Sequence, residues 1–233
     1  MSEKRALVTG ASSGIGRAVA ERLIRLGYDV TGIGRNFRQD ESKIRQVILD
    51  LTDEKGLREF LRSYREEGPA SLLVNCAGVA WYGMAEEMED SKVRAMLRTN
   101  LEAPMIITGA LLRDLKSVNG TVIFISSVTA DGPSPRACVY GAAKAGLTAY
   151  AESLFAENRK YGLKVSVIEP DLTDTDLYRN ADFRPESGEE YCLSAEDTAD
   201  AVEFILTRHA GEVLTHLTLR PQKNRIRRIG PGE

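Results

Sequence analysis

Short apolar runs alternate along the chain with longer segments in which apolar residues recur at helical spacing. Seven of the short runs are rich in aliphatic and β-branched residues, and they are predicted to be strands: 7–9, 30–33, 47–49, 72–74, 122–125, 165–168 and 214–219. Runs this apolar are typical of strands that are covered on both faces of a sheet. The pattern therefore predicts one parallel sheet of seven strands.

Helical spacing is clearest directly after the first strand, where Ile15, Val19, Leu23 and Leu26 recur until Gly27. Four further helices are predicted at 54–66, 91–115, 139–158 and 195–209. Right-handed crossovers between parallel strands place such helices on both faces of the sheet. We therefore expect a doubly wound, Rossmann-type α/β fold that forms a single domain over 1–233.

One long segment, 171–193, has no clear period and is rich in Asp, Glu, Pro and Gly. It follows the carboxyl end of a predicted strand, so we expect a mobile loop or lid next to the substrate. Trp81 and Tyr82 follow another strand at the same edge, and they either line a pocket or pack on the next helix. The basic residues near the C-terminus are expected to be solvated, and the alternative is that they bind an anion or a partner: Lys223, Arg225, Arg227 and Arg228.

Composition narrows the classes of function. The 233 residues are 42% hydrophobic and carry a formal net charge of −3, which fits a globular protein and argues against nucleic acid as the main ligand. No run approaches the roughly 18 apolar residues that a membrane span needs, so we expect no membrane association. The three cysteines have no C-x-x-C spacing, and the two histidines lack partners at ligand spacing. We therefore expect no metal site and a cytoplasmic location.

A glycine-rich turn, Thr9 to Gly16, joins the first strand to the first helix. Its glycines, Gly10, Gly14 and Gly16, allow a tight turn and let a pyrophosphate approach the helix N-terminus. Their spacing differs from G-x-G-x-x-G. The turn predicts a dinucleotide site, and the alternative is a plain glycine-rich turn.

The second predicted strand ends at Gly34 and Arg35, where an NAD-specific fold usually carries an acidic residue for the ribose 2′-hydroxyl. A guanidinium can instead bind a 2′-phosphate through charged hydrogen bonds. This favours NADP over NAD, unless Arg35 is merely a solvated surface residue.

Tyr140 and Lys144 lie four residues apart in a predicted helix, so the phenol and the ammonium share one face. A nearby cation lowers the pKa of a phenol and makes proton exchange feasible near neutrality. Ser126 and Ser127 end the preceding strand and could hydrogen-bond a substrate oxygen. Together these residues predict acid–base chemistry on a polar substrate atom.

The chain resembles the short-chain dehydrogenase/reductase family from about Arg5 to Pro221. The resemblance rests on motifs in the family's order: the turn of Thr9 to Gly16, Asp50, Asn75-Cys76-Ala77-Gly78, Asn100, Ser127, and Tyr140 with Lys144. The family's serine lies thirteen residues before its tyrosine, which selects Ser127 over Ser126.

The resemblance implies a role for each matched residue. Tyr140 would donate the proton in carbonyl reduction, Lys144 would lower its pKa and bind the nicotinamide ribose, Ser127 would hold the carbonyl oxygen, and Asn100 would anchor a water chain. The implied cofactor contacts are Gly10, Ser12, Ser13, Gly14, Ile15, Gly16, Arg35, Asn36, Asp50, Leu51, Asn75, Ala77, Gly78, Tyr140, Lys144, Pro170 and Thr175. Helices 91–115 and 139–158 form dimer contacts in relatives, so we expect a homodimer or homotetramer.

Two departures from the family pattern stand out. Asp171 replaces the glycine that usually follows Pro170, which adds a carboxylate beside the nicotinamide. The ending 216–221 looks more like the branch of NADP-dependent 3-hydroxy acid and serine dehydrogenases than like ketoacyl-carrier reductases. We therefore expect an NADP(H)-dependent oxidoreductase that interconverts a small carbonyl compound and its alcohol. The alternatives are a 3-ketoacyl-carrier reductase and a non-catalytic NADP-binding regulator.

Overall fold

A parallel sheet of seven strands forms the centre of the computed structural model, which describes residues 4–37 and 43–229. The strand order is β3-β2-β1-β4-β5-β6-β8, and every neighbouring pair is parallel. The strands are β1 (Lys4–Thr9), β2 (Tyr28–Gly34), β3 (Arg45–Ile48), β4 (Leu72–Asn75), β5 (Thr121–Ile125), β6 (Lys164–Pro170) and β8 (His216–Leu219). The predicted doubly wound α/β fold is confirmed. The ends of the expected 1–233 unit lie outside the described residues.

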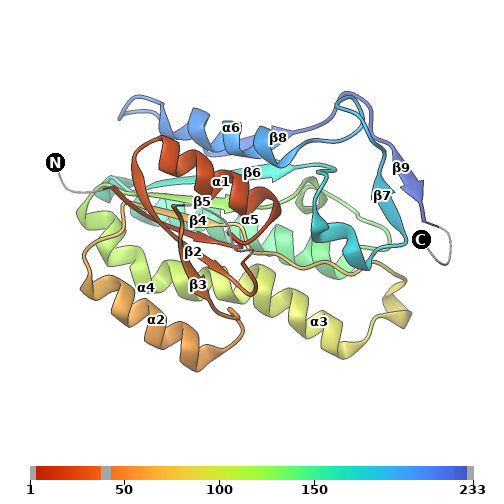
Figure 1. Cartoon of the computed structure of the whole chain (residues 1–233), viewed down its shortest axis with the longest axis horizontal. Helices are drawn as coiled ribbons and strands as arrows, with labels where there is room; N and C mark the ends of the chain where they lie inside the picture. Colours follow the sequence, from red (N-terminus) through yellow and green to blue (C-terminus); the bar gives the residue numbers. More distant parts are fainter. Residues whose placement is uncertain (1–3, 38–42, 230–233) are drawn as a thin grey trace.

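Helices cover both faces of this sheet (Figure 1). One face carries α1 (Gly14–Arg25) and α6 (Ala195–Leu206), and the other carries α2 (Glu54–Glu66), α4 (Ala103–Ser117) and α5 (Cys138–Asn158). The chain runs outward from β1 in both directions, because β2 lies on one side of it and β4 on the other. Ligands of such sheets bind at this switch point, outside the carboxyl ends of the strands.

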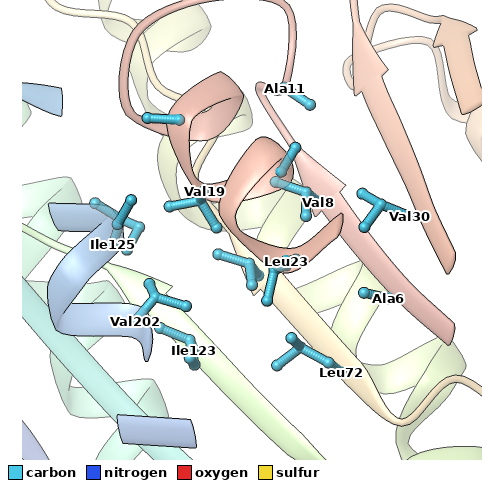
Figure 2. Close-up of a cluster of buried hydrophobic side chains, with 14 of the residues drawn as sticks. Ala6, Val8, Ala11, Val19, Leu23, Val30, Leu72, Ile123, Ile125 and Val202 are labelled. Atoms are coloured by element: carbon cyan, nitrogen blue, oxygen red, sulfur yellow. The ribbon is translucent and has the colours of Figure 1, made fainter. Parts of the chain in front are cut away.

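The core under α1 and α6 explains why the apolar spacing of the first helix matters (Figure 2). Val19 and Leu23 point from α1 onto Val8 of the central strand, and Val202 approaches from α6; all four are fully buried. Burying an aliphatic side chain of this size stabilises a fold by about 1.5–3 kcal/mol. This packing fixes the start of α1 against the end of β1, where the glycine turn lies.

The predicted helix 91–115 is wrong as a single element. The structure has α3 (Asp90–Leu97), a π-helical turn at Arg98–Glu102, and then α4. The turn contains Asn100, whose side chain is fully buried. Its amide exchanges two hydrogen bonds with the backbone of Val79, each 2.8 Å long. Apolar periodicity cannot show this interruption, because it is associated with a polar contact to another segment.

The segment 171–193 and the C-terminal residues also differ from expectation. The segment contains a 3₁₀ helix at Asp176–Asn180 and a short strand, β7 (Phe183–Pro185). Two of the basic residues, Arg227 and Arg228, lie in β9 (Ile226–Arg228), which pairs antiparallel with β7 in a separate two-stranded ribbon. The four basic side chains are exposed, as expected, but the backbone of 226–228 pairs with a distant segment, and no local pattern encodes that partner.

Within the residues that the structure describes, no helix is long and apolar enough to cross a bilayer.

Candidate functional site

A cavity of about 670 Å³ runs along the carboxyl ends of the central strands. It starts at the glycine turn after β1, passes the ends of β4 and β5, and reaches the β7–β9 ribbon. The cavity therefore lies at the switch point of the sheet, where the fold leaves room for a ligand.

The glycine turn is shaped by contacts that exclude side chains. Gly10 has a φ of 73°, and a Cβ atom there would lie 2.8 Å from the backbone of Ala77. The Thr9 hydroxyl accepts hydrogen bonds from the backbone N–H groups of Cys76 (3.0 Å) and Ala77 (3.1 Å). The turn after β1 and the turn after β4 thus lie directly against each other at one wall of the cavity.

The first turn of α1 faces this wall. Ser13 is the N-cap residue, its backbone is extended, and its side chain makes no capping hydrogen bond. The backbone N–H groups at a helix start have no partner within the helix, and they carry the positive end of the helix dipole. This end of the cavity can therefore bind an anionic group.

Arg35 lies on the cavity wall at the end of β2, and its side chain is exposed. Gly34 precedes it, and a Cβ atom at that position would lie 2.6 Å from Cβ of Ser12. A larger residue at position 34 would therefore disturb the turn. Asp50, on the same wall, has its pKa lowered mainly by the hydrogen bond from the Thr52 backbone N–H, with a smaller contribution from Arg35.

Tyr140 and Ser127 also line the cavity, near the ends of β5 and α5. Tyr140 is on the first turn of α5 and is 5% exposed, while Ser127 follows β5 and is 8% exposed. Burial raises the pKa of the phenol, and its hydrogen bond with the Ser127 hydroxyl acts in the opposite direction. The phenol is therefore protonated at neutral pH and can donate a proton.

Lys144 is buried one helical turn beyond Tyr140, and its Nζ lies 5.7 Å from the centroid of the Tyr140 ring. Its ammonium donates a hydrogen bond of 2.8 Å to the carbonyl oxygen of Ile125. Burial lowers the pKa of Lys144 to about 8. The expected lowering of the Tyr140 pKa by Lys144 is not observed in this structure, because the loss of hydration dominates at both groups.

Most of the sequence-predicted residues line this one cavity. They are Gly10, Ser12, Ser13, Gly14, Ile15, Gly16, Arg35, Asp50, Leu51, Ala77, Gly78, Ser127, Tyr140, Lys144, Pro170 and Thr175. Three lie outside its wall. Asn36 is exposed beyond β2, Asn75 is buried with its amide on the Thr108 hydroxyl (3.1 Å), and Asn100 is buried on Val79. The structure therefore brings together residues that lie far apart in the sequence.

An aromatic wall next to Tyr140 was only partly anticipated. Trp81 and Tyr82 both line the cavity, and both also pack on a buried cluster that includes Met96 of α3, so the two interpretations given above hold together. The Tyr82 ring stacks on Tyr178 with centroids 6.1 Å apart and meets the edge of Phe183 at 5.0 Å. Sequence reasoning missed Tyr178 and Phe183, although the aromatic residues in the segment 171–193 were a usable signal.

Asp171 does not present a free carboxylate to the cavity. Its side chain is 10% exposed and accepts hydrogen bonds from Asn224 at 3.2 and 3.3 Å. Arg220 forms an ion pair with it at 3.2 Å. The residue that departs from the family pattern therefore ties the C-terminal segment to the end of β6.

Comparison with known proteins gives relatives over nearly the whole chain. An uncharacterised oxidoreductase of Staphylococcus epidermidis is 31% identical over 230 residues, which cover 95% of this chain and 98% of that protein. The 3-oxoacyl-[acyl-carrier-protein] reductase of Escherichia coli is 35% identical over 185 residues, which cover 76% of each chain.

Solved structures of other proteins share the fold of this chain. An alcohol dehydrogenase from the archaeon Thermococcus sibiricus, complexed with 5-hydroxy-NADP, superimposes with a TM-score of 0.85 at 24% identity and covers 96% of this chain and 98% of its own. A closed form of serine dehydrogenase complexed with NADP⁺ gives a TM-score of 0.81 at 26% identity, covering 92% and 94% of the two chains.

The model of the short chain dehydrogenase family matches residues 4–185. This range includes the glycine turn, Ser127, Tyr140 and Lys144, so the match and the cavity concern the same residues. The chain therefore belongs to the short-chain dehydrogenase/reductase family and is an oxidoreductase that acts on CH–OH and C=O groups.

Proposed function

We propose that the protein is an NADP(H)-dependent reductase of small carbonyl compounds, with Tyr140 as the general acid. One observation carries the proposal: Ser127, Tyr140 and Lys144 line the same cavity as the α1 N-terminus and Arg35. The charged part suits a phosphorylated cofactor, and the buried part suits proton transfer.

The residues present fit a dinucleotide. Gly10 has no side chain to cover its backbone where the turn contacts Ala77. The N-terminus of α1 has no side chain that caps its backbone N–H groups. Arg35 has no ion-pair partner among the described residues, so its guanidinium is available to the 2′-phosphate. Several structural relatives are described as NADP complexes, which supports the same choice. NADPH, when bound, supplies the hydride for reduction.

The protein's own residues handle the proton. Ser127 and Tyr140 would both hydrogen-bond the substrate oxygen, which orients it and stabilises the negative charge that develops there. Tyr140 would then donate its proton to that oxygen. Lys144, fixed on the Ile125 carbonyl one helical turn beyond the phenol, would bind the nicotinamide ribose. Asn100 would hold the Val79 backbone behind this wall, and its expected part in proton resupply stays a prediction.

A direct test measures NADPH consumption by absorbance while keto acids, ketosugars and aromatic ketones are added in turn. We expect the wild-type protein to oxidise NADPH with at least one of them. Tyr140→Phe should keep NADPH binding, followed by cofactor fluorescence, and lose about 10²-fold or more in kcat because the general acid is removed. Near-normal turnover by the variant would contradict the role of Tyr140. NADPH binding without consumption of any carbonyl would favour the non-catalytic regulator.

The 3-oxoacyl-carrier reductase remains the second candidate, since named relatives of that activity are 31–35% identical to this chain. Including an acetoacetyl thioester in the same assay separates the two. We also propose a homodimer or homotetramer, and a cytoplasmic location that fits the three unpaired cysteines.

A further inference from the structure

The end of the cavity farthest from the glycine turn is walled by the C-terminal strand. In the β7–β9 ribbon, Phe183 pairs with Arg228 and Pro185 with Ile226. Successive side chains of a strand point to opposite faces, so Ile226 and Arg228 share one face and Arg227 lies on the other. The cavity follows this alternation: Ile226 and Arg228 line it, and Arg227 does not.

The ribbon is held in place by contacts at both ends. Asp171 accepts hydrogen bonds from Asn224 and pairs with Arg220, as described above. Lys223 forms an ion pair with Glu190 at 2.6 Å. The backbone N–H of Ile229 donates to the carbonyl of Asp182 at 2.9 Å, beyond the last ladder pair. The side chain of Arg228 is thus presented to the cavity by an anchored strand, not by a free terminus.

Three carboxylates lie around this end of the cavity, at Asp171, Asp176 and Asp182. Two of them already have cationic partners: Asp171 pairs with Arg220, and Asp182 pairs with Arg136 at 3.2 Å. Only the exposed Asp176 is left without an ion pair in the part of the chain that the structure describes.

Two arginines at this end of the cavity, Arg179 and Arg228, have no carboxylate partner among the described residues. Across residues 4–37 and 43–229, no carboxylate lies within ion-pair distance of Arg179 or Arg228. Arg179 donates to the backbone carbonyl of Asp176 at 3.2 Å, whereas Arg228 has no side-chain hydrogen bond or ion pair within those ranges. A guanidinium without a carboxylate partner, beside an aromatic wall, is suited to an anionic ligand oxygen.

We propose that Arg228 binds an anionic group of the substrate, a carboxylate or a phosphate, while the reacting carbonyl lies at Tyr140. This inference rests on the proposed carbonyl reduction and adds the class of substrate. The rings of Tyr82, Tyr178 and Phe183 lie between these two points and would contact the apolar part of the molecule. The C-terminal strand is therefore a specificity element that selects charged over neutral ketones.

The experiment compares ketones that differ only in charge. The pairs are phenylglyoxylate, 3-benzoylpropanoate and 4-benzoylbutanoate, each with its methyl ester, and dihydroxyacetone phosphate with dihydroxyacetone. Wild type, Arg228→Ala, Arg228→Lys and the matched control Arg227→Ala are assayed for kcat and KM, and NADPH binding is measured for each. Arg227 carries the same charge in the same strand and faces away from the cavity.

We expect the wild type to favour an anionic ketone over its neutral partner by about tenfold or more in kcat/KM, mainly through KM, as for a hydrogen bond to a charged group. Arg228→Ala should remove this preference, Arg228→Lys should keep part of it, and Arg227→Ala should keep all of it. Whether the preference is found with the keto acids or with the phosphate identifies the anionic group.

Equal kcat/KM within every pair for the wild type would overturn the proposal, and so would an Arg228→Ala protein with the wild-type preference. Loss of the preference in Arg227→Ala as well would show that general positive charge, and not Arg228, is responsible. Failure to reduce any ketone, charged or neutral, by a chain that binds NADPH would instead count against the proposed reductase.

Discussion

At the scale of single residues, we propose that Arg35 decides the choice between NADP and NAD. The end of β2 carries Gly34 and Arg35, and Gly34 cannot be enlarged without a clash with Ser12. A carboxylate at the end of β2 would repel a 2′-phosphate, whereas the Arg35 guanidinium attracts it. The choice between the two cofactors is therefore concentrated in one exposed side chain.

Removing Arg35 should separate the two cofactors. Arg35→Ala is expected to lower kcat/KM for NADPH by about 10- to 150-fold, the equivalent of losing 1.5–3 kcal/mol from a charged hydrogen bond. The value for NADH should barely change, because NADH lacks the phosphate. Steady-state kinetics with both cofactors measure this. Equal losses would show that Arg35 supports the fold, and a wild type that prefers NADH would refute the NADP assignment.

Lys144 should make stability depend on pH. Its pKa is about 8 in the folded chain and about 10.4 when unfolded, so between these values the unfolded chain binds more protons. Stability from this group therefore rises with pH in that window, by at most about 1.4 kcal/mol per pH unit. The Lys144→Met variant lacks this ionisable group, so it lacks this dependence of stability on pH.

Urea unfolding of wild type and Lys144→Met at pH 7, 8, 9 and 10 tests this. The free energy of unfolding of the wild type should rise relative to that of the variant from pH 8 to pH 10. The comparison with the variant cancels the groups whose titration does not depend on Lys144. A constant difference between the two proteins would show that Lys144 keeps an ordinary pKa.

At the scale of elements, two contacts between segments distant in sequence shape the site. The π-helical turn between α3 and α4 holds Asn100 on Val79, and the β7–β9 ribbon encloses the substrate end of the cavity. β9 has three residues and lies apart from the main sheet. A ribbon this short needs additional anchors, which Asp171 supplies.

Asp171→Ala should therefore loosen the C-terminal segment without disturbing the sheet. Arg220 and Asn224 would lose their shared acceptor, and we expect a loss of about 1–3 kcal/mol of stability. Hydrogen exchange followed by mass spectrometry should show faster exchange in 220–229 and unchanged exchange in β1 and β4. Asp182→Ala removes an exposed ion pair and serves as the control. Equal protection of 220–229 in wild type and Asp171→Ala would rule out the anchor.

At the scale of the whole molecule, we propose that copies of the chain associate through exposed apolar side chains. Ile106 on α4 is 45% exposed and Leu97 at the end of α3 is 38% exposed, on the helices that are expected to form a dimer contact. Phe204 on α6 is also 45% exposed, but α6 covers the opposite face of the sheet. Light scattering at micromolar concentration should give at least twice the 25.6 kDa of one chain.

Ile106→Glu should shift this mass toward that of a monomer, because a buried charge without a partner weakens an apolar interface. Phe204→Glu should leave the mass unchanged. A wild-type monomer mass would refute the assembly, and a monomer produced by Phe204→Glu alone would place the contact on the other face.

The amino-acid sequence by itself determined the order of strands and helices, the glycine turn and the Tyr140–Lys144 pair. These features depend on neighbours within a few residues, so periodicity and spacing reveal them. The tertiary structure decided the rest. The π-helical turn, the β7–β9 ribbon and the raised pKa of Tyr140 arise where segments far apart in the chain meet. Burial and backbone pairing at such contacts depend on the folded surroundings, and no local pattern of residues specifies them.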